Sequence, residues 1–201
     1  MESVTAWIIR GCCQSSLNQN GGAAMELSGK RVLIFAGPDF EDRELFYPLY
    51  RFLEAGATVK VAGLGEKTYK GKYGLPIEVD GICADFVKES WDAVVIPGGW
   101  APDKIRANNE ALEIVRKTLK NGNVVASICH GGWVLASADV VKGKTVTSFE
   151  NIKHDLIHAG ATWVDKEVVV DSGIVTSRKP SDLPAFCRET IKLMQKSKVA
   201  V

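Results

Sequence analysis

The sequence has few cysteines and no uninterrupted apolar run long enough to cross a membrane. A spanning helix needs roughly 20 consecutive apolar residues, so we expect no spanning helix and no membrane partner. An odd, scattered set of cysteines does not suggest a disulfide framework. Instead it indicates a reducing compartment, and we expect a cytoplasmic protein. The five lie at Cys12, Cys13, Cys83, Cys129 and Cys187.

The sequence also lacks an excess of charge of either sign. It holds 25 Lys and Arg against 24 Asp and Glu, for a formal net charge of +1. Composition therefore gives no reason to expect a nucleic acid as partner. Histidine is scarce, and His154 and His158, which could share a helix face, lack an acidic partner in the same motif. We expect no metal and no organic cofactor.

What is present is ordinary for a globular chain, with 46% hydrophobic and 24% charged residues over 201 positions. That length suffices for one domain with a sizeable core. Residues 1–28 are polar, small and without periodicity, so they predict a flexible N-terminal extension. Alternatively, Met25 is the true start of the protein. We expect residues 29–201 to form a single α/β domain.

Short apolar runs alternate with amphipathic segments from residue 31 onward. This pattern predicts a mostly parallel sheet with helices on both faces. Ligand sites in such sheets lie at the carboxyl ends of the strands. Strands are expected near residues 31–36, 58–63, 91–96 and 124–128, and helices after residues 39, 108, 151 and 181. A small ribbon is expected within residues 68–79 and a hairpin turn at 171–173.

The strongest functional signal lies at Cys129 and His130, where a β-branched run stops and a helix begins after Gly131-Gly132. A sharp strand-to-helix turn of this kind is the geometry of a nucleophile elbow. Unpaired N–H groups at a helix start would lower the pKa of the Cys129 thiol and favour the thiolate. His130 could be its general base. The alternatives are a buried structural cysteine and a histidine that caps the helix or faces solvent.

Two other strand ends could complete such a site. Glu41 follows the first strand, and its carboxyl could reach Cys129, although its neighbours Asp39, Asp42 and Glu44 compete for any acidic role. The alternative is a carboxylate that only interacts with a helix dipole.

Gly98 and Gly99 follow another strand, and their N–H groups could form an oxyanion hole with that of His130. A tight turn that requires a positive φ is the alternative for the two glycines. Asp103 could orient a histidine. Cys83 and Cys187 have no such context and are interpreted as packing residues.

Three stretches together resemble the PfpI-type intracellular cysteine peptidases and the related protein deglycases. They are Phe40-Glu41-Asp42-x-Glu44-Leu45, Pro-Gly-Gly-x-Ala-Pro-Asp at residues 97–103, and Ala126-Ser127-Ile128-Cys129-His130-Gly131. Later pieces between residues 147 and 183 also match, so the resemblance covers about residues 30–196. It implies the class I glutamine amidotransferase-like superfamily, with a flavodoxin-like three-layer α/β sandwich and a nucleophile elbow.

The resemblance also implies roles. Cys129 is expected as the nucleophile, Glu41 as the carboxyl that hydrogen-bonds the thiolate, and Gly99 with the His130 amide as oxyanion donors. In peptidase members the acid of the triad comes from a neighbouring subunit at the position of Asp103, where they have Glu. We therefore expect a homo-oligomer, either a dimer or a dimer-built hexamer.

Three functions remain open. The first is a cysteine-dependent enzyme that acts on glyoxals or glycation adducts, of the glyoxalase III or protein deglycase type, in a stress response. The second is a peptidase with a triad completed across subunits. The third is a non-enzymatic redox-sensing or chaperone protein in which Cys129 is oxidised. The expected substrate is a small carbonyl compound, a peptide or a protein.

Overall fold

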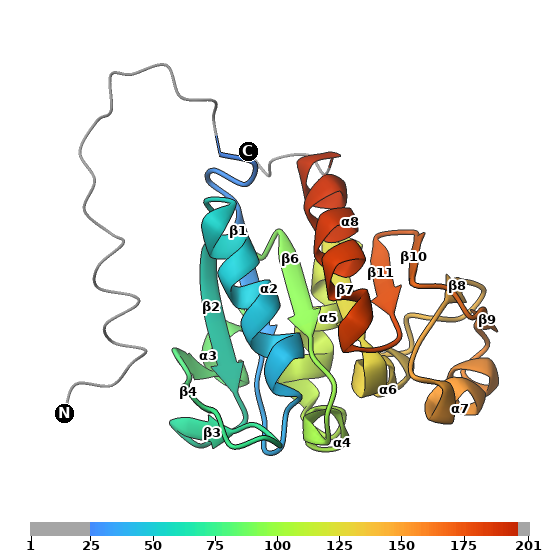
Figure 1. Ribbon diagram of the computed structural model, residues 1–201, viewed down its shortest axis with the longest axis horizontal. Coiled ribbons are helices and arrows are strands. Elements are labelled where there is room, and N and C mark those ends of the chain that lie inside the picture. Colours follow the sequence, from blue (N-terminus) through green and yellow to red (C-terminus); the bar gives the residue numbers. More distant parts are fainter. Residues whose placement is uncertain (1–24, 197–201) are drawn as a thin grey trace.

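A computed structural model describes residues 25–196, which fold around a seven-stranded sheet (Figure 1). The strand order is β10-β11-β7-β6-β1-β2-β5, and within this sheet β10 alone runs antiparallel to its neighbour. The sheet is therefore mostly parallel, as expected. Its strands are β1 (Arg31–Phe35), β2 (Thr58–Gly63), β5 (Gly81–Ile82), β6 (Ala93–Ile96), β7 (Val124–Ile128), β10 (Val168–Asp171) and β11 (Ile174–Ser177).

Helices cover both faces of the sheet and make a three-layer sandwich. Helices α2 and α8 lie side by side on one face, where α2 contacts β1 and β2 while α8 contacts β7 and β11 (Figure 1). On the other face α5 packs against β6 and β7, with α3 beside it. These helices are α2 (Asp42–Glu54), α3 (Cys83–Phe86), α5 (Asn109–Lys120) and α8 (Leu183–Lys196).

Helix α5 shows why these segments are helical. The side chain of Asn108 caps its start by accepting the Ala111 N–H at 2.8 Å, which satisfies one of the unpaired donors of the first turn. Its buried residues, among them Leu112 and Val115, recur at helical spacing and face the sheet. The end of α5 leads through Gly122, at φ +76°, into the fully buried strand β7.

Two small excursions lie outside the main sheet. The first is the antiparallel ribbon of β3 (Thr68–Lys70) and β4 (Pro76–Glu78). The turn of this ribbon is held by Asp42 at the start of α2, whose carboxylate accepts the N–H of Tyr73 at 3.0 Å and of Leu75 at 3.1 Å. The second contains β8 (Thr145–Val146), the 3-10 turn Glu150–Ile152, α7 (Lys153–His158) and β9 (Thr162–Trp163).

The packed part of the chain begins before residue 29. Leu27 is buried in the core, and its N–H donates to the carbonyl of Ala55 at 2.8 Å. The expected extension up to residue 28 therefore overlaps the domain at its end, and its residues 1–24 lie outside the described part of the chain. No helix within residues 25–196 is both long and apolar enough to cross a membrane.

Candidate active site

Cys129 stands at a strained turn at the end of β7. Its φ is +58°, whereas Ile128 before it is extended at φ −129°. A positive φ is uncommon for a residue with a side chain and is tolerated where the surroundings enforce it. The 3-10 turn Cys129–Gly131 runs directly into α6 (Gly132–Ser137). The chain therefore forms the expected elbow, which lifts the Cys129 side chain out of the sheet.

The sulfur of Cys129 faces hydrogen-bonding groups from two strand ends. It lies 3.3 Å from Nδ1 of His130. The backbone N–H groups of His130 and Gly99 also interact with it and lower its pKa. Donors in these positions stabilise negative charge on the sulfur or on an oxygen bound beside it.

The carboxyl group beside Cys129 belongs to Glu44, in the first turn of α2. Its Oε2 accepts the N–H of Gly98 at 2.8 Å, and the residue is fully buried. Burial and the nearby charge of Glu41 raise the pKa of Glu44 to about 8, although the Gly98 N–H and the Cys129 thiol act in the opposite direction. The other oxygen, Oε1, has no hydrogen-bond partner of ordinary geometry. At neutral pH this carboxyl can therefore carry a proton and donate it.

The expected pairing of Glu41 with Cys129 is wrong. Glu41 is the N-cap of α2, and its Oε2 accepts the Glu44 N–H at 2.9 Å. Its Oε1 accepts Nε of Arg43, also at 2.9 Å. Both oxygens are thus occupied by the start of its own helix. Glu44 lies three residues further on, in the first turn of the same helix, where its carboxyl faces Gly98 and the Cys129 thiol. The sequence holds no local signal that separates it from the neighbouring acids.

The two glycines after β6 have different roles. Gly98 donates its N–H to Glu44, so that amide does not serve as the expected oxyanion donor. A Cβ on Gly98 would lie 2.6 Å from Oε2 of Glu44 and 2.7 Å from Cβ of Cys129. Gly99, at φ +77°, keeps its N–H directed to the sulfur, as expected.

Burial raises the pKa of the Cys129 thiol, and the negative charge of Glu44 raises it further. This is the reverse of the shift expected from the helix start. The His130 and Gly99 N–H groups and the ammonium of Lys72 favour the thiolate, but they do not outweigh desolvation of the sulfur in a residue that is 8% exposed. Because a negative charge on either group disfavours ionisation of the other, the state in which Cys129 and Glu44 are both ionised is disfavoured.

The ring of His130 is surrounded by aromatic side chains. Its centroid lies 5.6 Å from that of Trp100, 5.0 Å from that of Trp133 and 5.0 Å from that of Phe149. Burial and the charge of Lys72 lower the pKa of His130, so the imidazole is neutral at pH 7. Within the described residues of this one chain, no carboxylate is hydrogen-bonded to the His130 ring.

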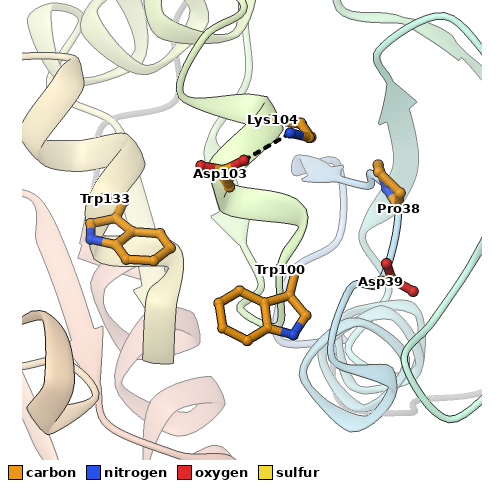
Figure 2. Close-up of a pocket in the computed structure, with 6 residues that line it drawn as sticks. All are labelled: Pro38, Asp39, Trp100, Asp103, Lys104 and Trp133. Carbon is orange, nitrogen blue, oxygen red and sulfur yellow. Dashed lines mark ion pairs between the residues drawn. The ribbon is translucent and has the colours of Figure 1, made fainter.

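Asp103 lies on the surface, on the short helix α4 (Ala101–Ile105). Its side chain is 54% exposed and forms an ion pair with Lys104 at 3.0 Å. The structure therefore does not join Asp103 to His130 of the same chain. Figure 2 shows the Asp103–Lys104 pair above Trp100, between Trp133 of α6 and the Pro38-Asp39 loop that follows β1.

Two hollows adjoin the elbow. The first cleft, of about 370 Å³, is lined by Pro38, Asp39, Trp100, Asp103, Lys104 and Trp133 (Figure 2). The second cleft, of about 300 Å³, is lined by Ser148, Phe149, Glu150, Trp163, Asp165, Arg178 and Lys179. Both include aromatic residues that contact the ring of His130, namely Trp100 and Trp133 in the first and Phe149 in the second.

Residues 25–196 hold no group of three or more His, Cys, Asp or Glu side chains that could bind a metal ion. The rings of His154 and His158 lie 6.4 Å apart on α7 without such partners. Cys83 and Cys187 are free and buried, and they pack in the core as expected.

Known proteins are similar to this chain in sequence. A deglycase of Pyrococcus abyssi is 46% identical over 165 residues, which are 82% of this chain and 99% of that protein. A Bacillus subtilis protein named "Putative cysteine protease YraA" is 40% identical over 167 residues, 83% of this chain and 99% of its own. Both relatives thus match nearly from end to end.

Solved structures are similar to this chain in fold. DJ-1beta of Drosophila melanogaster superposes with a TM-score of 0.77 at 28% identity, over 83% of this chain and 94% of that one. A two-domain protein of Anabaena variabilis, with DJ-1/ThiJ/PfpI-like and ferritin-like domains, gives 0.77 at 40% identity over 81% of this chain and 47% of that one. The family model described as DJ-1/PfpI matches residues 30–193. The chain therefore belongs to the DJ-1/PfpI family.

Proposed function

We propose that this protein is a cysteine-dependent enzyme that acts on glyoxals or on early glycation adducts. The observation that carries the proposal is the convergence of the Cys129 sulfur, the Glu44 carboxyl and the N–H groups of His130 and Gly99 on one point. Such a site suits attack on a carbonyl carbon, because the donors lie where negative charge develops on oxygen. Relatives named as deglycases support the same reaction class.

For methylglyoxal, the proposed first step forms a bond between the Cys129 sulfur and the aldehyde carbon. The thiol proton ends on the former carbonyl oxygen, and Glu44 carries it. A proton then moves from the former aldehyde carbon to the neighbouring ketone carbon, and the hydroxyl proton moves to the ketone oxygen. These two transfers convert the hemithioacetal into the thioester of lactate. Water hydrolyses the thioester to lactate and returns the free thiol. Glu44, with a pKa near 8, suits both proton transfers because it gives and accepts a proton near neutral pH.

The test supplies purified protein with methylglyoxal and, separately, with methylglyoxal adducts of N-acetylarginine and N-acetyllysine. Wild-type protein should release lactate, whereas Cys129→Ser should not, with circular dichroism to confirm that the variant is folded. Cys187→Ser is the matched control, since that thiol is buried away from the site on α8. Equal activity of Cys129→Ser and wild type would exclude the proposal.

A peptidase is the second candidate, and the exposed position of Asp103 favours it. Its carboxylate stands at the rim of the first cleft, where it is 54% exposed and could face another chain. In this proposal the protein is a homo-oligomer, and Asp103 of one subunit orients His130 of the next. The relative named as a cysteine protease fits this activity.

The redox-sensing alternative has less support. Oxidation by peroxide begins with a thiolate that is accessible. Burial keeps the Cys129 sulfur largely covered and its pKa raised.

A further inference from the structure

The inner side of the reacting centre is closed by a carboxyl group and by backbone. Glu44 is fully buried there. A Cβ on Gly98 would already lie 2.6 Å from Oε2 of Glu44 and 2.7 Å from Cβ of Cys129. The N–H of Gly99 faces the sulfur from the end of the same strand. The part of a bound carbonyl compound that does not react must therefore point outward, away from Glu44.

The outer side of the reacting centre is built from aromatic rings. The imidazole of His130, whose Nδ1 lies 3.3 Å from the Cys129 sulfur, is the first of them. The rings of Trp100, Trp133 and Phe149 lie around it, at centroid distances of 5.6, 5.0 and 5.0 Å. A group that points outward from the sulfur meets these rings first. Because aromatic rings favour stacked and edge-to-face contacts with one another, a flat aromatic group suits this side.

Trp100 is the most exposed tryptophan within residues 25–196. It is 61% exposed, whereas Trp91 is buried and Trp133 and Trp163 are half-buried. Its backbone is nevertheless fixed, since its N–H donates to the carbonyl of Asp39 at 2.9 Å. Exposed apolar surface that continues into a hollow is typical of a ligand-binding surface. The exposed indole is thus held in place beside the site.

Trp133 supplies a second fixed indole. Its Nε1 donates to Oδ2 of Asp155 at 2.7 Å, and the guanidinium of Arg106 lies 5.6 Å from the centre of its ring. Figure 2 shows this indole and that of Trp100, which come from different elements and both line the first cleft. The volume of that cleft, about 370 Å³, lies within the range of small-molecule sites. The cleft can therefore accept a phenyl group against the two indoles.

We propose that Trp100 and Trp133 are specificity-determining residues that favour glyoxals with a flat aromatic ring over methylglyoxal. Phenylglyoxal is the simplest compound of this class. Its aldehyde carbon would bond to the Cys129 sulfur, with the phenyl group against the indoles. The steps proposed for methylglyoxal then apply with phenyl in place of methyl, so the hemithioacetal becomes a thioester and water releases mandelate. The inference rests on the proposed function for the reaction and adds the class of substrate.

The first test measures binding at the nucleophile without turnover. Wild-type protein is treated with iodoacetamide in the presence of mandelamide or lactamide, which are neutral and differ only in a phenyl or a methyl group. Mass spectrometry of the Cys129 peptide gives the alkylation rate. We expect mandelamide to halve this rate at a concentration about three- to tenfold lower than lactamide, the effect of one or two aromatic contacts. Equal protection, or no protection by either amide, would overturn the proposal.

Variants of Trp100 separate recognition of the ring from general hydrophobicity. Trp100→Leu should bring the two concentrations within about twofold of each other, whereas Trp100→Phe, which keeps a ring, should retain most of the preference. Tyr47→Leu is the matched control, because it removes a 41% exposed aromatic ring from α2 and should leave the preference unchanged. An unchanged preference in Trp100→Leu contradicts the proposal. So does altered elution of this variant in size-exclusion chromatography, which would assign Trp100 to a contact between chains.

Turnover distinguishes this inference from the proposed function. In Trp100→Leu, kcat/KM should fall about three- to tenfold for phenylglyoxal and change little for methylglyoxal. Protection that depends on Trp100, in a protein that converts neither glyoxal, supports recognition of the ring and contradicts only the proposed reaction. Conversely, turnover of methylglyoxal with equal protection by the two amides keeps the reaction and removes the aromatic preference.

Discussion

At the scale of single residues, the site depends on the position of one carboxyl group. Four acids lie between residues 39 and 44, and only Glu44 is placed beside the sulfur. Glu41 instead begins the helix that carries it. The cap formed by Glu41 thus orients the first turn of α2, and this turn places the Glu44 carboxyl where it accepts the Gly98 N–H.

Substitution of these two glutamates separates their roles. Glu44→Gln removes the proton carrier beside Cys129, and we expect turnover to fall by about 10²- to 10⁴-fold, the range for loss of a general acid or base. Glu41→Ala removes an N-cap, so we expect a loss of about 1 kcal/mol of stability with activity within a few-fold of wild type. Steady-state kinetics and urea unfolding of both variants provide the measurements. The reverse ranking in turnover would restore Glu41 as the functional acid.

The raised pKa of Glu44 makes stability depend on pH in a defined direction. Its folded-state pKa is about 8, against 4.5 for an ordinary glutamate. Between these values the unfolded chain releases a proton that the folded chain keeps, so unfolding is favoured as pH rises through this window. The stability that the protonated Glu44 contributes is fully present below pH 4.5 and is lost as the pH rises through about 8.

Urea unfolding at pH 5 and pH 8 tests this direction, with Cys129→Ser as background to remove the coupled thiol. The background protein should lose more stability between these two pH values than the same protein with Glu44→Gln, which cannot ionise there. Identical pH dependence in the two proteins would show that the buried carboxyl titrates normally.

At the scale of elements, the site is assembled from loops at the carboxyl ends of neighbouring strands. Phe40, in the loop after β1, forms an isolated β-bridge with Gly99, which follows β6. Phe40 forms a second such bridge with Gly71 of the ribbon turn. Lys72 follows in that turn and favours the thiolate of Cys129. The ribbon is therefore part of the electrostatic environment of the site, although it lies outside the main sheet.

Asp42→Ala should loosen the ribbon turn. The carboxylate accepts two backbone N–H groups there, and hydrogen bonds to a charged group contribute about 1.5–3 kcal/mol each, so we expect a loss of a few kcal/mol. Hydrogen exchange at Tyr73 and Leu75 should become faster. Glu110→Ala is the control, since it also removes an acid from a first helical turn but has no contact with the ribbon. Unchanged exchange in Asp42→Ala would contradict this role.

Much of this arrangement could be predicted from the sequence, because strand runs and glycine-rich strand ends follow local patterns. Cys129, His130 and Gly99 all lie within three residues of the end of a buried strand, where the pattern indicated. The carboxyl could not be chosen in this way, since successive residues of a helix differ in direction by about 100° and only the exact N-cap decides which one faces inward. The pKa of Cys129 depends on burial by groups from several loops, which no local pattern reports.

At the scale of the whole molecule, the chain leaves the site open to another copy. Asp103 and Trp100, the latter 61% exposed, stand on the surface at the rim of the first cleft. His130 has no carboxylate partner within the described residues of its own chain. Our proposal of a homo-oligomer follows from these two facts together.

Mixing two inactive variants tests the shared site. Asp103→Ala and Cys129→Ala chains are unfolded together, refolded in equal amounts and assayed for peptide cleavage. In a two-fold symmetric dimer, half of the dimers are mixed and each has one intact site, so about a quarter of wild-type activity should return. Each variant refolded alone is the control. If mixing restores nothing while wild-type protein cleaves the peptide, the triad is not shared between chains.

The aromatic enclosure of His130 has a practical consequence for observing the enzyme. Two of the five tryptophans, Trp100 and Trp133, lie with ring centroids 5.6 and 5.0 Å from the imidazole. An imidazolium quenches indole emission at such contact more strongly than the neutral ring does. Intrinsic fluorescence should therefore report the protonation state of His130 and the arrival of a ligand in the first cleft, without any attached dye.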